Sequence, residues 1–138
     1  MRFALSRGFR IVYLDEMMVT KSTLPKTEWS HKLHNYRLDL SKIDTSAIAV
    51  LCAVSREFGI EHVMLFPRSV DRMKFAQFLE ALRGKCWADD IHLVMDNLAV
   101  HRSHVITDRM DELGFGYSWT PAYSPQYNGI EEVFAMAK

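Results

Sequence analysis

The segment that decides the fold is residues 91–97, which read IHLVMDN. Its first five residues form a mainly apolar run of strand length, and the run stops at Asp96. Residues 9–16 read FRIVYLDE and have the same form, a β-branched and aromatic run that leads into Asp15. If these two strands lie side by side and parallel, both carboxylates come to one edge of a sheet, where open α/β sheets bind ligands.

The rest of the chain predicts a mixed sheet with helices on its faces. Apolar runs of strand length recur at residues 47–54, 60–66 and 115–119. Helical spacing of apolar residues is found in two segments, one capped by Ser69 or Asp71 and stopped at Gly84, the other capped by Ser103 and stopped before Gly114. The polar segment 20–45 and the turn-rich segment 121–129 are expected to be loops, and a last helix is expected from Ile130. The order β-β-β-α-β-α-β-α therefore predicts an α/β fold with a mixed five-stranded sheet.

Length and composition predict one globular domain over residues 1–138, with 49% apolar and 25% charged residues. The 17 basic and 17 acidic residues cancel, which excludes a polybasic binder that holds nucleic acid by bulk charge alone. No apolar run is long enough to span a membrane, and no signal peptide is evident. Cys52 and Cys86 form neither a metal spacing nor a disulfide framework, so a reducing, intracellular location is expected.

The zero net charge hides an asymmetry between the two ends of the chain. Residues 1–42 carry eight Lys and Arg against four acids, whereas residues 43–138 carry nine against thirteen. This division suggests an anionic partner on one side and a cation site on the other. Two ordinary solvated faces are the alternative explanation.

Three acids stand at the ends of expected elements: Asp15, Asp96 and Glu131. Carboxylates that meet in a sheet repel each other unless a cation lies between them. Hard oxygen ligands favour Mg²⁺ or Mn²⁺, and such a cluster suits phosphoryl transfer with two metal ions.

Each of these acids also has a structural explanation. A single Asp at a strand end is commonly a turn or cap residue, and Glu131 fits a capping box with Asn128 as the cap. Glu132 is an alternative ligand. His101 and His104 are expected at the surface, whereas His92, Trp29, Trp119 and the eight methionines are expected to pack rather than bind.

Three segments in order carry a resemblance to a known family: LDE at 14–16, VMDN at 94–97 and YSPQYNGIE at 123–131. The chain resembles the D-D-E catalytic domain of mariner-like transposases and their bacterial insertion-sequence relatives. The family pattern Y-S-P-x-x-N-P-I-E is the most specific of the three. Further matches are the D-N-x-x-x-H pattern that ends at His101, the 34 residues between Asp96 and Glu131, and an aromatic-x-x-x-Lys ending over residues 134–138.

The resemblance implies a ribonuclease H-like fold and the catalytic core of a DNA transposase, which cleaves and joins DNA strands. It assigns catalysis and the binding of two Mg²⁺ or Mn²⁺ ions to Asp15, Asp96 and Glu131, with support from Asn97, His101 and Asn128. The basic residues Lys21, Lys26, Lys32 and Lys138 are expected to contact DNA, because an acidic pocket by itself repels phosphate.

The expected partners are double-stranded DNA, as transposon ends and target, and a second copy of the chain in the full-length protein. The protein is expected with the DNA, in the nucleus of a eukaryote or the cytoplasm of a bacterium, and not in a membrane. The chain departs from the family in Gly129, which replaces a proline, and in the expected absence of an N-terminal helix-turn-helix region.

Other functions fit the sequence less well. A catalytically degenerate or domesticated DNA-binding module of the same fold is the main alternative, and the presence of all three acids disfavours it. A phospho-acceptor signalling domain is disfavoured by the 80 residues and two further strands between Asp15 and Asp96. A Holliday-junction nuclease does not explain the segment 123–131.

Overall fold

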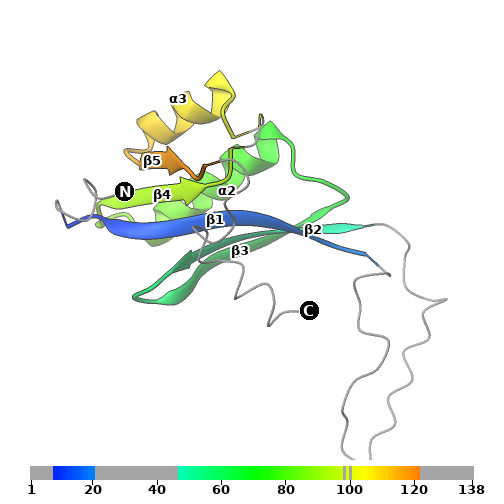
Figure 1. The fold of residues 1–138 in the computed structure, drawn as a ribbon, viewed down its shortest axis with the longest axis horizontal. Coiled ribbons are helices and arrows are strands. Elements are labelled where there is room, and N and C mark those ends of the chain that lie inside the picture. Colours follow the sequence, from blue (N-terminus) through cyan, green and yellow to red (C-terminus); the bar gives the residue numbers. More distant parts are fainter. Residues whose placement is uncertain (1–7, 21–46, 98, 100, 122–138) are drawn as a thin grey trace, which may run out of the picture.

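The computed structural model describes residues 8–20, 47–97, 99 and 101–121. Its strands form one five-stranded sheet in the order β3-β2-β1-β4-β5, with α3 beside β5 and α2 beside α3 (Figure 1). No helix in this part of the chain is long and apolar enough to cross a membrane. The elements are β1 (Arg10–Val19), β2 (Ile48–Ser55), β3 (Gly59–Pro67), α2 (Arg72–Lys85), β4 (Ile91–Met95), α3 (His104–Glu112) and β5 (Gly116–Trp119).

The strand directions confirm the expected mixed sheet. β1 is antiparallel to β2, and β2 is antiparallel to β3, whereas β4 is parallel to both β1 and β5. The carboxyl ends of β1, β3, β4 and β5 therefore lie toward one edge of the sheet, called the carboxyl edge below. The expected loop at 20–45 and the expected helix from Ile130 lie outside the described residues.

The first strand is longer than the sequence predicted. Asp15 was expected to follow the strand, but β1 continues to Val19 because it pairs with β2 as far as Val19 opposite Ile48. Its pairing with β4 ends earlier, at Tyr13 opposite Val94. Asp15 is thus inside a strand but just beyond the end of the ladder with β4.

Both helices pack on one face of the sheet. Asp71 caps α2 by accepting a hydrogen bond from the Lys74 backbone N–H at 2.9 Å, so Asp71 and not Ser69 is the cap. α2 passes the expected stop at Gly84 because the backbone N–H of Cys86 still reaches the carbonyls of the last turn. The main core is formed by alternate strand residues and by the apolar stripes of the two helices, which include Phe75, Phe78, Leu79, Leu82, Ile106 and Met110.

One histidine is buried in this core without a polar partner among the described residues. His62 on β3 is 8% exposed and stacks on Phe78, with 5.0 Å between the ring centres. Neither of its ring nitrogens has a hydrogen-bond partner there. Burial lowers the pKa of His62, and the positive charge of Lys85 lowers it further.

This lowered pKa gives a prediction for pH-dependent stability. As the pH falls below about 6.5, the unfolded chain binds a proton at His62 before the folded chain does, so the free energy of unfolding decreases. His62→Leu should reduce this acid sensitivity, by up to about 1.4 kcal/mol per pH unit in the window between about pH 6.5 and the lowered folded pKa. Urea unfolding of both proteins across this range measures the difference, and parallel pH profiles would contradict it.

Candidate active site

The register between β1 and β4 relates Asp15 to Asp96. β1 and β4 pair in parallel from Arg10 opposite Ile91 to Tyr13 opposite Val94. The ladder ends there, and the same register continued by two residues would put Asp15 level with Asp96 near the carboxyl edge. Neighbouring strands in a sheet are about 4.8 Å apart, so this register favours a short distance between the two residues.

Asp15 and Asp96 each directly follow a residue of the main core. Leu14 and Met95, the residues just before them, are fully buried in the main core on the helix-covered face. Because successive strand side chains alternate, Asp15 lies on the opposite face with Tyr13. Asp96 lies one residue beyond the end of β4, and its carboxylate contacts His101. The structure thus puts two of the three predicted ligands toward the carboxyl edge, and their shared metal site and role in catalysis stay predictions.

The residues around Asp15 favour a metal site with oxygen ligands over one with a thiolate ligand. Its Oδ1 accepts a hydrogen bond of 2.8 Å from the backbone N–H of Glu16, and Cys52 lies directly opposite on β2. Burial raises the pKa of the Cys52 thiol, and the negative charge of Asp15 raises it further. A thiol that remains protonated is a poor metal ligand, so the site keeps the hard carboxylate chemistry that suits Mg²⁺ or Mn²⁺.

Asp96 is held by His101. The Nδ1 atom of His101 lies 2.6 Å from Oδ1 of Asp96 and 3.3 Å from its backbone oxygen. His101 was expected at the surface, but it is only 2% exposed because its ring stacks on Phe75 of α2, with 4.7 Å between the ring centres. His104 is exposed as expected. A buried ring therefore contacts Asp96 at its side chain and at its backbone oxygen, although the side-chain contact does not have the geometry of a hydrogen bond.

The remaining predicted residues divide into one that is described and six that are not. The Oδ1 atom of Asn97 accepts a hydrogen bond of 3.3 Å from Arg102, which ties the loop after β4 to the start of α3. Glu131, Asn128, Lys21, Lys26, Lys32 and Lys138 lie outside the described residues, as does the alternative ligand Glu132. Within the described part, no group of three His, Cys, Asp or Glu side chains could hold a metal ion, so a complete site needs a further ligand.

Sequence reasoning missed the contribution of Phe75. The D-N-x-x-x-H pattern pointed to His101 but gave no sign of what would bury it. Phe75 is on a helix that precedes β4, and only the packing of α2 against the sheet brings the two rings together.

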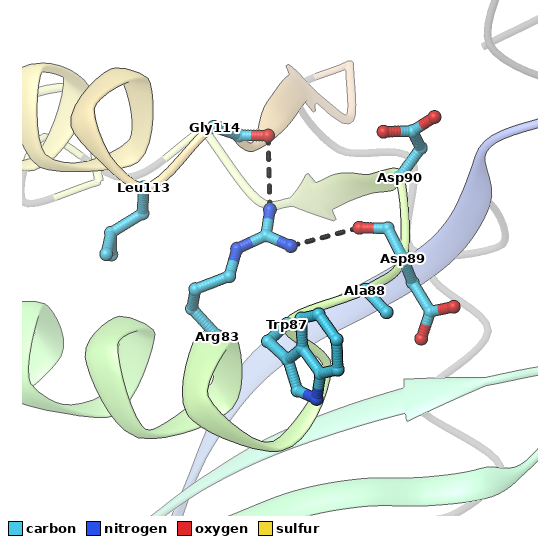
Figure 2. Close-up of a pocket in the computed structure, with 7 residues that line it drawn as sticks. All are labelled: Arg83, Trp87, Ala88, Asp89, Asp90, Leu113 and Gly114. Atoms are coloured by element: carbon cyan, nitrogen blue, oxygen red, sulfur yellow. Dashed lines mark hydrogen bonds between the residues drawn. The ribbon is translucent and has the colours of Figure 1, made fainter.

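A pocket of about 260 Å³ lies at the opposite edge of the sheet, where β4 and β5 begin (Figure 2). Figure 2 shows Arg83 reaching across it from α2 toward the turn at Asp89 and toward Gly114. Its guanidinium donates hydrogen bonds to three backbone oxygens, those of Cys86 (3.2 Å), Asp89 (3.0 Å) and Gly114 (3.1 Å). Arg83 therefore links three segments of the chain and takes no part in the acid pair.

Removing this link should destabilise the fold. Arg83→Met keeps the aliphatic stem but loses the three hydrogen bonds and the stacking on Phe115, where the guanidinium carbon is 4.1 Å from the ring centre. The expected loss is about 2–3 kcal/mol in the free energy of unfolding by urea. Lys85→Met, an exposed change at the same helix end, is the control and should alter stability by less than about 0.5 kcal/mol. Equal effects of the two changes would contradict this role of Arg83.

Comparisons with known proteins agree with the fold and identify a family. A family model described as DDE superfamily endonuclease matches residues 10–138. The Mos1 mariner paired-end complex with Mn has a TM-score of 0.70 at 18% identity over 99% of this chain and 45% of that chain. The Mos1 transposase catalytic domain with Raltegravir and Mn has a TM-score of 0.71 at 16% identity over 99% and 63% of the two chains.

A more distant match is the simian T-cell lymphotropic virus intasome in complex with a PP2A regulatory subunit, with a TM-score of 0.63 at 12% identity over 92% of this chain and 37% of that chain. The chain spans less than half the length of the Mos1 chains in the paired-end complexes. No curated protein sequence matches it. The structural matches support the ribonuclease H-like fold, and the family model confirms the resemblance drawn from the three sequence segments.

Proposed function

Because the chain belongs to the DDE superfamily endonuclease family, we propose that its carboxyl edge cleaves and joins DNA strands with the help of divalent metal ions. The observation that carries this proposal is that Asp15 and Asp96 lie toward the carboxyl ends of the adjacent parallel strands β1 and β4, two residues beyond the last paired residues Tyr13 and Val94. Turn or cap residues do not require that relation, whereas a shared metal ion does.

The donor set fits Mg²⁺ or Mn²⁺. Asp15 and Asp96 would supply hard carboxylate oxygens to such ions, and Glu131 is proposed as the third ligand. When bound, such ions neutralise charge on the scissile phosphate and lower the pKa of an attacking water. The chain's own contribution is to hold the carboxylates in place: Asp15 by its strand pairing with Cys52, and Asp96 by the contact with the buried His101.

DNA is the proposed substrate. Solved relatives include Mos1 complexes with a transposon end, and the first 42 residues of this chain carry the positive charge that a phosphate backbone needs. Lys21, Lys26, Lys32 and Lys138 are proposed as backbone contacts. We further propose that the protein acts on transposon ends and target DNA as a homodimer when it is part of a longer chain, and that it is located with the DNA of its host cell.

The test is nicking of supercoiled plasmid by the 138-residue chain, with Mn²⁺ or with EDTA. Nicking that needs the metal is the expected result. Binding of DNA without any nicking would instead support the degenerate DNA-binding module. If the chain neither binds nor nicks DNA, both proposed functions are overturned.

A further inference from the structure

A second group of charges lies at the carboxyl edge, in the turn between β3 and α2. β3 runs parallel to β1 and β4, so the turn that begins at Arg68 is at the same edge as Asp15 and Asp96. Arg68 in this turn and Arg72, the first residue of α2, are both exposed. The edge therefore carries exposed cationic side chains in addition to the two acids.

The backbone of this turn is held in an uncommon conformation. Arg68 has a φ of +69°, the one positive φ at a non-glycine residue among the described residues. A hydrogen bond of 3.0 Å from the backbone N–H of Ser69 to the Pro67 oxygen closes a γ-turn around it. A glycine would adopt this φ without strain, so the arginine is present at a conformational cost.

The contacts around the turn make it rigid. The backbone N–H of Arg68 donates to the Ala47 oxygen at 2.7 Å. The Lys74 Nζ donates to the Ser69 oxygen at 2.6 Å and to the Pro67 oxygen at 3.4 Å. Lys74 thus fixes the backbone of the turn, and the Arg68 side chain that projects from it is exposed.

The two arginines differ from most other basic residues of the described part in having no polar or acidic partner there. Arg10 pairs with Glu61 and Asp89, and Arg109 pairs with Glu80 and Glu112. Arg68 and Arg72 have no side-chain hydrogen bond or ion pair within the described residues. Arg56 and Lys85 share this property, but they lie at the opposite edge of the sheet, in the β2–β3 turn and at the end of α2.

We propose that Arg68 and Arg72 form a phosphate-binding site that contacts the DNA backbone a few nucleotides from the reacting phosphate, with Lys74 as the residue that positions the turn. The inference rests on the proposed function and adds binding residues that the sequence did not suggest. Charge complementarity favours DNA, since the aspartates at this edge repel phosphate and need a nearby cationic surface to hold the strand.

The spacing suits a contact a few nucleotides from the site of reaction. Pro67 is level with Ile48, which is level with Val19, four residues beyond Asp15 along β1. With about 3.3 Å per residue along a strand and about 4.8 Å between strands, the turn is roughly 16 Å from Asp15. That distance corresponds to about five base pairs of B-DNA.

The test measures binding of a fluorescent duplex of about 30 base pairs by anisotropy, between about 0.05 and 0.3 M salt. Arg68→Gly combined with Arg72→Ala should lower the salt slope of log K by about 1.8 and weaken binding about 10- to 60-fold at about 0.1 M salt, since each phosphate contact contributes about 0.9 to the slope. The control, Arg56→Ala combined with Lys85→Ala, loses the same charge at the opposite edge and should keep the wild-type slope.

A second readout separates binding from folding. Arg68→Gly alone relieves the backbone strain and should raise the melting temperature by about 2–5 °C while it weakens DNA binding. A higher melting temperature with unchanged affinity would overturn the proposal. Equal losses of DNA affinity in the double variant and its control would also overturn it, because they would show that only the net charge of the protein matters for binding.

The two levels of the proposal fail in different ways. If wild type nicks plasmid with Mn²⁺ and the double variant keeps the wild-type salt slope, the phosphate-binding role of Arg68 and Arg72 is wrong and the enzyme function stands. If wild type neither binds nor nicks DNA, both are wrong.

Discussion

Asp96→Asn is expected to lower the rate of Mn²⁺-dependent plasmid nicking about a thousandfold or more, with the fold unchanged. The amide keeps the shape of the side chain and a contact to His101, but it removes the negative charge that holds a metal ion at the carboxyl edge. Metal ions contribute several kcal/mol to phosphoryl transfer, and about 4 kcal/mol corresponds to a thousandfold in rate. Asp15→Asn should have an effect of similar size, because Asp15 is proposed to hold the same metal ion as Asp96.

The matched control is Asp90→Asn. Asp90 directly precedes β4 and is exposed at the opposite edge of the sheet, so the same chemical change is made at the other end of the same strand. Nicking by Asp90→Asn should equal that of wild type. If Asp96→Asn retains wild-type nicking, the catalytic site is not at this edge.

His101→Phe is expected to reduce nicking roughly 10- to 100-fold and to raise the Mn²⁺ concentration that gives half-maximal rate. The phenyl ring keeps the stacking on Phe75 but has no ring nitrogen to contact Asp96. In the wild type, Nδ1 of His101 lies 2.6 Å from Oδ1 of Asp96. The carboxylate then samples more rotamers, and part of the binding free energy of the metal is lost in ordering it.

Two further variants distinguish positioning from a loss of packing. His101→Asn places an amide near the position of Nδ1 and should restore part of the Mn²⁺ affinity, although it packs less well on Phe75. His104→Phe, at an exposed position three residues later, should change neither the rate nor the metal dependence. If the Mn²⁺ requirement of His101→Phe matches that of wild type, His101 acts only through folding.

Much of the fold followed from local patterns. The run at residues 91–97 and its counterpart at 9–16 predicted two parallel strands with acids at one edge, and β4 has the expected bounds, Ile91–Met95. Apolar spacing also gave the buried face of α2, Phe75, Phe78, Leu79 and Leu82. Such patterns are enough to predict an element where the spacing of its apolar residues matches a single buried face.

Features that depend on distant parts of the chain were not predictable in this way. The extension of β1 beyond Asp15 is set by pairing with β2, some thirty residues later, and the residues Glu16 to Val19 carry no strand signal of their own. The burial of His101 depends on Phe75 from another element, and the strained conformation of Arg68 depends on Lys74 and Ala47. Each arises from tertiary contacts that outweigh local propensity.

The most direct test of the central claim is a crystal of the protein soaked in Mn²⁺, with diffraction data collected for anomalous scattering. The proposed function predicts an anomalous peak between the carboxylates of Asp15 and Asp96, about 2.0–2.3 Å from an oxygen of each, which is lost or much weaker in Asp96→Asn. A wild-type crystal with no peak at this edge, or with the same peak after Asp96→Asn, would contradict the claim that these two acids share a metal site.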